Sequence, residues 1–177
     1  MAGADIMALP EGAIDEVAAR VGSCLRGEHD GTGLRIGIAC ALFNGGISVR
    51  LLHGALDALS AAGTDREDVT VAWAPGAFEL PLVARAFAAA GKVDAVLCIG
   101  AVIRGETGHY DFVAGECAAG IQQVQLSTGV PVIFAVLTTN TLEQALARSE
   151  PDDSNKGREA VLTGIEMVRL LRTGPLS

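Results

Sequence analysis

Residues 93–128, VDAVLCIGAVIRGETGHYDFVAGECAAGIQQVQLST, contain a strand, a loop and a helix in immediate succession. The first part, up to residue 103, is almost continuously apolar, which is typical of a strand buried on both faces of a sheet. A polar, glycine-bearing loop follows, and from residue 109 apolar side chains recur at helical spacing. The inner face of this helix is expected to hold Val113, Cys117, Ile121 and Val124. The unit predicts a parallel sheet, because a crossover helix returns the chain to the same sheet edge.

The same alternation continues over the rest of the chain from residue 34. Strands are predicted at 34–43, 69–74, 93–103 and 130–137, and helices at 47–63, 80–91, 109–128, 141–148 and 156–171. We therefore expect an α/β fold, a three-layer α/β/α sandwich with a four-stranded parallel sheet. Residues 1–33 are predicted to be an N-terminal extension with one short helix, whose apolar stripe starts at Ile14, and a flexible glycine-bearing joint at 27–33. The domain proper is expected to span 34–177.

The composition of the 177 residues is that of one folded domain. Half of the residues are hydrophobic and 19% are charged, enough to bury a core. Acidic residues outnumber basic ones by 21 to 13, for a net charge of -8, which argues against nucleic acid or an anionic membrane as a partner. The longest uncharged apolar run, 95–103, is about half of a membrane span. With no secretory signal recognised, a cytoplasmic location is expected.

Few residues suit metal, cofactor or covalent chemistry. The widely spaced cysteines are expected to be buried free thiols, namely Cys24, Cys40, Cys98 and Cys117. The three histidines are equally dispersed, without the spacing of metal ligands. The glycine-rich nucleotide motifs G-x-G-x-x-G and G-x-x-x-x-G-K-[ST] and the nucleophile elbow G-x-S-x-G are missing. We therefore expect no metal and no organic cofactor.

Ligands of parallel sheets bind beyond the carboxyl ends of the strands, and here those ends carry two candidate walls. Phe43 ends a predicted strand, and its ring either caps the core or forms a flat wall for a planar heterocycle. Ala77, Phe78 and Glu79 precede a predicted helix, whose free N–H groups suit an oxygen-rich ligand. The carboxylate of Glu79 could equally cap that helix.

Proton carriers and anion ligands can also be proposed at the strand ends. His109 is the one histidine there, and imidazole exchanges protons near neutral pH, although a lone surface histidine is often without function. The candidate anion ligands are Arg104, Thr107, Arg148 and Lys156. The last two flank a polar turn, where they either bind an anion or neutralise the acidic residues Glu150, Asp152 and Asp153.

At these same residues the chain resembles the 6,7-dimethyl-8-ribityllumazine synthases. The resemblance covers about 34–171 and is carried by FN at 43–44, PGAFELP at 75–81, GAVIRGETGHYD at 100–111, VLTT at 136–139, EQA at 143–145 and NKG at 155–157. It implies a flavodoxin-like fold and the penultimate step of riboflavin biosynthesis. In that step 5-amino-6-(D-ribitylamino)uracil condenses with 3,4-dihydroxy-2-butanone 4-phosphate, releasing phosphate and water without a cofactor.

The resemblance also implies a role for each matching residue. Phe43 would stack on the uracil ring, and the other pyrimidine and ribityl contacts would come from Ala77, Phe78, Glu79, Ala101, Val102 and Ile103. Glu106 and Thr107 would contact the phosphorylated ketone, and His109 would carry protons. The neighbouring subunit would supply Phe134 and the phosphate ligand Arg148, and Lys156 would lie near the phosphate.

The assembly implied by the resemblance is a homopentamer, with a shell of 60 subunits as an open alternative and riboflavin synthase as a possible protein partner. The chain departs from the family pattern at Ala135, where glycine is commoner, and at Ser149-Glu150, which replace Ala-Gly. Two functions of other classes are the alternatives. One is a shell or flavin-binding protein without turnover, and the other is a generic flavodoxin-like binding module.

Overall fold

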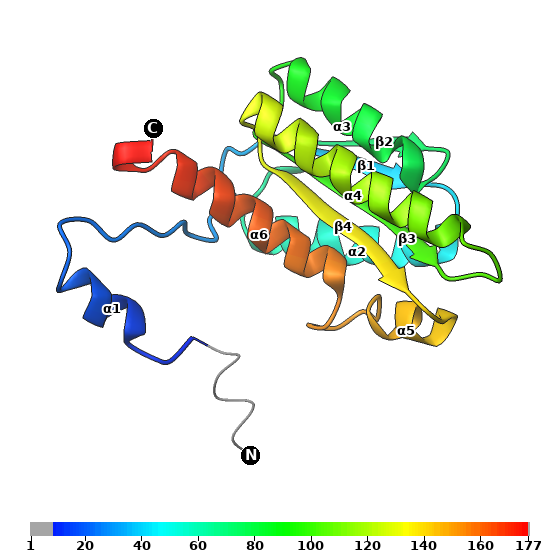
Figure 1. Cartoon of the computed structure of the whole chain (residues 1–177). Helices are drawn as coiled ribbons and strands as arrows, with labels where there is room; N and C mark the ends of the chain where they lie inside the picture. Colours follow the sequence, from blue (N-terminus) through cyan, green and yellow to red (C-terminus); the bar gives the residue numbers. More distant parts are fainter. Residues whose placement is uncertain (1–8, 177) are drawn as a thin grey trace.

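The computed structural model describes residues 9–176, and within them four parallel strands form one sheet in the order β2-β1-β3-β4 (Figure 1). The strands are β1 (Ile36–Ala41), β2 (Val69–Ala74), β3 (Ala95–Ile103) and β4 (Val132–Thr139). The helices are α1 (Ala13–Ala18), α2 (Gly45–Ala61), α3 (Leu80–Ala89), α4 (His109–Thr128), α5 (Leu142–Ala147) and α6 (Lys156–Leu171), with short 3-10 helices at η1 (Arg66–Asp68), η2 (Ala77–Glu79) and η3 (Gly174–Leu176). The predicted fold and its four-stranded parallel sheet are confirmed.

Most predicted boundaries hold within two residues. The strand at 69–74 and the helices at 109–128 and 156–171 have the predicted limits. The first strand is shorter than predicted, because it ends at Ala41 and leaves Leu42 and Phe43 outside the sheet with exposed side chains. The last strand starts later, at Val132, and continues to Thr139, where a polar residue can still pair its backbone.

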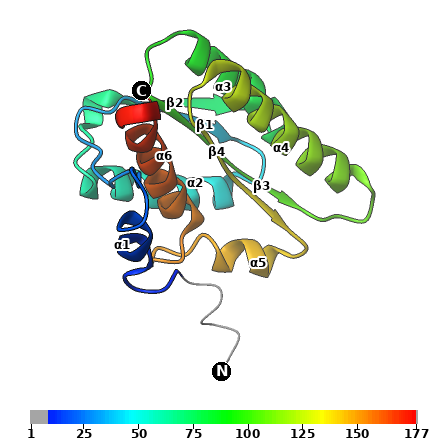
Figure 2. The same ribbon diagram turned by 60° about the vertical axis from the view of Figure 1, so that its left-hand side comes forward.

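Helices cover both faces of the sheet, with α3 and α4 on one face and α2 and α6 on the other (Figures 1 and 2). The central strands β1 and β3 are buried along nearly their whole length, so their residues alternate between the two cores. Small side chains let the α3–α4 layer approach closely. A Cβ at Gly120 of α4 would lie 2.8 Å from the ring of Pro81 in α3.

The other layer depends on a close crossing of α2 and α6. Asn155 is 1% exposed and caps α6, since its Oδ1 accepts bonds from the backbone N–H groups of Gly157 (2.9 Å) and Arg158 (3.3 Å). Its Nδ2 donates to the carbonyl of Arg50 in α2 (3.3 Å). Gly157 lies against α2 so closely that a Cβ there would collide with the carbonyl oxygen of Leu51. The cap and the glycine together fix how α6 crosses α2.

The N-terminal extension differs from its prediction. α1 ends at Ala18 and has no buried residue. The segment 27–33, expected to be a joint, instead packs against α6 and the end of α2: His29 reaches Glu166 (3.2 Å), and the N–H of Gly31 donates to the carbonyl of Ala62 (2.7 Å). Arg26, just before this segment, also reaches Glu166 (3.4 Å). Figure 1 shows α1 standing apart from the sheet and its covering helices. Residues 1–8 of the predicted extension lie outside the described residues.

The cysteines are free thiols, and three of the four are buried as predicted. Burial raises the pKa of the Cys40 and Cys117 thiols to about 11, and it also raises the pKa of Cys98. The prediction was wrong for Cys24, which is exposed because the segment that carries it lies outside the core. Among residues 9–176, no helix has the length and hydropathy that a bilayer span requires.

We expect Gly157→Ala to lower the free energy of unfolding by about 1 to 3 kcal/mol, because the added methyl group must push α6 away from α2. The matched control is Gly115→Ala in α4, where an added Cβ meets nothing within 4 Å. That change should be neutral or stabilising by up to about 1 kcal/mol through helix propensity. Urea unfolding of both variants at one protein concentration measures the difference. Equal stabilities would show that the α2–α6 crossing is not constrained at Gly157.

Candidate active site

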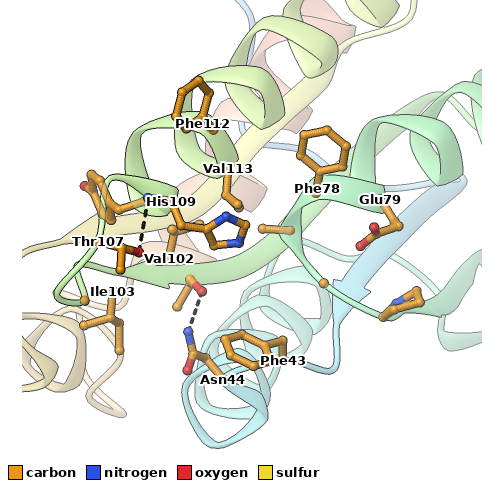
Figure 3. A pocket seen from close by; sticks show the side chains of 16 residues that line it. Phe43, Asn44, Phe78, Glu79, Val102, Ile103, Thr107, His109, Phe112 and Val113 are labelled. Atoms are coloured by element: carbon orange, nitrogen blue, oxygen red, sulfur yellow. Dashed lines mark hydrogen bonds between the residues drawn. The ribbon is translucent and has the colours of Figure 1, made fainter.

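A cavity of about 630 Å³ lies at the carboxyl ends of the strands (Figure 3). Four segments line it: the end of β1, the turn after β2, the end of β3 with its loop, and the start of α4. The lining residues are Phe43, Asn44, Pro75, Gly76, Ala77, Phe78, Glu79, Ala101, Val102, Ile103, Gly105, Thr107, His109, Tyr110, Phe112 and Val113. This is the sheet edge at which the sequence predicts a ligand.

Phe43 is a wall of this pocket, and the alternative that it caps the core is wrong, since it is 72% exposed. Its backbone is held from two sides. The N–H of Phe43 donates to the carbonyl of Pro75 (3.0 Å), and the Nδ2 of Asn44 donates to the carbonyl of Ala101 (2.8 Å). Asn44 has a φ of 56°, a left-handed conformation that asparagine tolerates better than most residues. The ring is therefore exposed on a fixed support.

Glu79 is also available to a ligand. It is the residue before α3, but its side chain makes no capping hydrogen bond, so the alternative interpretation as a helix cap is wrong. The carboxylate of Glu79 instead lies beside Gly76, since a Cβ added to this glycine would be 3.3 Å from Oε2 of Glu79. The 3-10 turn Ala77–Glu79 itself lines the pocket, and it is closed by the N–H of Glu79, which donates to the carbonyl of Gly76 (3.3 Å).

The end of β3 forms the floor, and the start of α4 carries the imidazole. Ala101 and Val102 are buried beneath the cavity. His109 is the first residue of α4, and Figure 3 shows its ring pointing toward the space between Phe43 and Phe78. Its backbone N–H faces the Thr107 hydroxyl oxygen at 3.5 Å. Glu106 belongs to the same loop but does not line the cavity.

Arg104 does not fit its interpretation as an anion ligand. Its guanidinium donates two hydrogen bonds to the carboxylate of Asp111 (2.9 and 3.3 Å) and one to the side chain of Asn140 (3.1 Å). The hydrogen bonds with Asp111 raise the pKa of Arg104. Arg104 is also absent from the cavity lining.

Sequence reasoning missed Phe112 and Val113, which line the pocket one turn after His109. The signal was present, because residues three and four positions apart share a helix face. Val113 was assigned to the core face, and it is half-buried at the border between the core and the pocket. Asn44 was also missed as a support of the pocket wall, since its partner Ala101 is far away in the sequence.

The remaining predicted site residues, Phe134, Arg148 and Lys156, lie elsewhere. They line a groove of about 770 Å³ along the edge strand β4, between α4 and α6. Phe134 is 40% exposed there, the Nη1 of Arg148 donates to the carbonyl of Gln144 (3.0 Å), and Lys156 pairs with Glu159. The groove shares no lining residue with the pocket. One chain therefore does not bring the two groups together.

The acidic residues of the turn after α5 do not face the groove. Glu150 pairs with Arg50 (2.7 Å), Asp153 pairs with Arg158 (3.3 Å), and Asp152 accepts hydrogen bonds from Ser154 that lower its pKa. The alternative that Arg148 and Lys156 neutralise these carboxylates is therefore wrong. Ala135, where the family more often has glycine, also lines the groove, but its methyl group packs in the α2–α6 core, on the face of β4 opposite to the Phe134 ring.

The arrangement suits a planar heterocycle bound between apolar walls, with one imidazole and one carboxylate at its edge. Residues 9–176 hold no group of three His, Cys, Asp or Glu side chains that could bind a metal ion. The groove adds the Phe134 ring, which suits an aromatic group, and the guanidinium of Arg148, which suits an anionic group, while Lys156 is paired with Glu159 of the same groove.

A comparison with protein families agrees with this chemistry. The family model of 6,7-dimethyl-8-ribityllumazine synthase matches residues 33–172, which include the whole sheet, the pocket and the groove. A match over so much of the chain shows that the protein belongs to the 6,7-dimethyl-8-ribityllumazine synthase family, the enzymes of the condensation step of riboflavin biosynthesis.

Proposed function

We propose that the pocket and the groove are two halves of one active site, formed where the pocket of one subunit meets the groove of the next. The observation that carries this proposal is the separation of the site residues into two exposed surfaces with no residue in common. The substrates would be 5-amino-6-(D-ribitylamino)uracil and 3,4-dihydroxy-2-butanone 4-phosphate. Residues 34–177 would be the catalytic domain and residues 1–33 an extension of it.

The pocket half would bind the pyrimidine. Phe43 would stack on the uracil ring, a contact worth about 0.5 to 1.5 kcal/mol beyond the burial of area. Backbone groups of Ala77 and Phe78 and the uncapped carboxylate of Glu79 would bind the polar atoms of the pyrimidine and of the ribityl chain. The floor contacts would come from Ala101, Val102 and Ile103.

The groove half would close the site and bind the phosphate. Phe134 of the adjacent subunit would cover the pyrimidine from the side opposite Phe43. Among the hydrogen bonds of residues 9–176, the guanidinium of Arg148 makes one, from Nη1 to the carbonyl of Gln144. Its Nε and Nη2 would therefore be available for a two-pronged contact with phosphate. Lys156 would add a second positive charge, and Glu106 and Thr107 of the pocket loop would contact the ketone.

The reaction would then proceed by proximity and proton transfer. The 5-amino group attacks the ketone carbonyl and water leaves, which gives an imine. Loss of a proton beside the imine expels phosphate, and the ribitylamino nitrogen closes the ring with loss of a second water. His109, at the edge of the pocket, would carry the protons. Alignment of the two substrates supplies the rest of the acceleration.

A site shared in this way requires contacts that are head to tail, because each subunit uses a different surface toward each of its two neighbours. Such contacts close into rings. We propose a homopentamer, with the 60-subunit shell as the larger alternative. A contact with riboflavin synthase, which would receive the product, and a cytoplasmic location are proposed from the family alone. A shell protein without turnover would have no use for the uncapped Glu79 and the His109 ring in the pocket.

His109→Ala should lower the turnover number by about 10² or less, the lower end of the contribution of a positioned acid or base, since water can replace part of the proton transfer. Binding of the pyrimidine should change little, because Phe43 and Glu79 are untouched. Steady-state kinetics and a fluorescence titration with the pyrimidine measure the two effects. An unchanged turnover number would exclude His109 as the proton carrier.

Arg148→Ala should mainly raise the KM for the phosphorylated ketone. A charged hydrogen bond to phosphate contributes about 1.5 to 3 kcal/mol, or roughly a 10- to 150-fold change. Arg148→Lys should restore only part of the loss, because lysine lacks the planar fork. Arg158→Ala, a change of the same charge at an arginine paired with Asp153, is the control and should leave the KM unchanged. Equal damage to the KM of both substrates would indicate a structural role for Arg148.

Mixed rings test the shared site directly. Phe43→Ala and Arg148→Ala subunits, dissociated and reassembled together, should regain activity wherever the intact pocket of one meets the intact groove of the other. An equal mixture should restore roughly a quarter of the sites. The control mixes Phe43→Ala with His109→Ala, both in the pocket half, and should regain nothing. If rings confirmed as mixed by mass spectrometry stayed inactive, both residues would act within one chain.

A further inference from the structure

The side chain of Arg104 joins three segments that surround the mouth of the pocket. Its own backbone N–H donates to the carbonyl of Thr139 (2.9 Å), so Arg104 continues the pairing of β3 with β4 by one residue. From this position the guanidinium binds the carboxylate of Asp111 in a two-pronged manner (2.9 and 3.3 Å) and the side chain of Asn140 (3.1 Å). It also lies over the ring of Tyr110, 4.0 Å from its centroid.

The contact with Asp111 closes the loop that carries the reacting side chains. Arg104 precedes this loop and Asp111 lies in the first turn of α4, so the ion pair bridges residues 105–110. Packing contributes little to the shape of this loop. A Cβ at either Gly105 or Gly108 would meet nothing within 4 Å. The loop is therefore held mainly at its two ends, and the guanidinium holds both.

The contact with Asn140 fixes the guanidinium from the other side. The backbone N–H of Asn140 donates to the side-chain oxygen of Gln144 (2.8 Å), and the carbonyl of Gln144 accepts from Arg148 (3.0 Å). The network thus continues from the pocket loop through the turn after β4 to the arginine of the groove. Each link is a hydrogen bond between neighbouring segments of the same chain.

From this geometry we infer that Arg104 is a positioning residue for the reaction. It holds the loop and the first turn of α4 so that Thr107 and His109 face the pocket. The inference rests on the proposed roles of these two residues. A direct contact of Arg104 with phosphate does not fit, because Asp111 already balances its charge and Arg104 does not line the cavity.

A role limited to the stability of the fold does not fit either. The side chains of Arg104 and Asp111 are 42% and 64% exposed. Ion pairs as exposed as this one contribute little to the free energy of unfolding. A two-pronged ion pair does fix the orientation of the groups that it joins, and this matters at a catalytic site, where a group must be held within a fraction of an ångström.

The test compares Arg104→Gln, Asp111→Asn and the double variant in the full-length, assembled protein. Each single change should lower the turnover number by about tenfold, because a displaced proton carrier loses alignment with the substrate. The double variant should be no worse than either single one, since both changes break the same contact. The KM for the pyrimidine and the melting temperature should stay unchanged. Arg104→Lys should not restore turnover, because lysine cannot make the two-pronged contact.

Hydrogen–deuterium exchange gives a readout independent of activity. The amides of residues 105–110 should exchange faster in both single variants, while those of β1 and β3 should not change. Arg66→Gln is the control for charge. This change removes a cation from η1, which precedes β2 and lies at the opposite end of the sheet from the pocket. Both the exchange of residues 105–110 and the turnover number should stay at the level of the unmodified protein.

Several results would overturn the inference. If Arg104→Gln raised the KM for the phosphorylated ketone and weakened inhibition by inorganic phosphate while Asp111→Asn did neither, Arg104 would be a phosphate ligand. Additive losses in the double variant, or loss of the fold in both single variants, would also exclude positioning. Failure of the proposed function is distinguishable, because the unmodified protein would then form no lumazine and His109→Ala would have no effect on turnover.

Discussion

The parallel pairing of β1 with β3 is the constraint on which the rest of the structure depends. Both strands are buried on both faces, so almost no polar side chain can be placed along them. Polar and reactive groups are therefore confined to the strand ends, and parallel pairing brings all the carboxyl ends to one edge. The pocket is built there from segments that are distant in the sequence, of which Phe43, Glu79 and His109 carry the chemistry proposed for it.

The turns around the pocket are rich in glycine, yet hydrogen bonds hold their backbone in place. Asn44 and Arg104 each follow the end of a central strand and each reach across to a neighbouring segment, Ala101 in one case and Asn140 with Asp111 in the other. These bonds replace the packing that glycine-rich turns lack. Among residues 9–176, Glu79 is the one carboxylate in the lining of the pocket, and no lysine or arginine lines it, which agrees with the proposal that the condensation is accelerated mainly by alignment.

The sequence was sufficient for the sheet and for much of the site, but not for its tertiary contacts. The strand 69–74 and the helix 109–128 could be predicted because turn residues, Pro75 and Gly129, limit them. The role of Phe43 could not be decided from the sequence, because an apolar residue at the end of a strand gives the same pattern whether its side chain faces the core or a ligand. The packing of residues 26–31 on α6 and the pairing of Arg104 with Asp111 could not be predicted, because no local pattern records which partner a charged side chain finds. The division of the site into pocket and groove came from the family resemblance alone, not from any pattern in the residues.

The distribution of the thiols has a practical consequence for labelling. Cys40, Cys98 and Cys117 are enclosed in the core with pKa values raised by burial, so at neutral pH they are almost wholly protonated and out of reach of a maleimide. Cys24 is exposed on the extension, outside the sheet and the pocket. A dye can therefore be attached at one defined position without mutagenesis, and energy transfer between donor and acceptor dyes on different copies would report how far apart the extensions lie in the proposed ring.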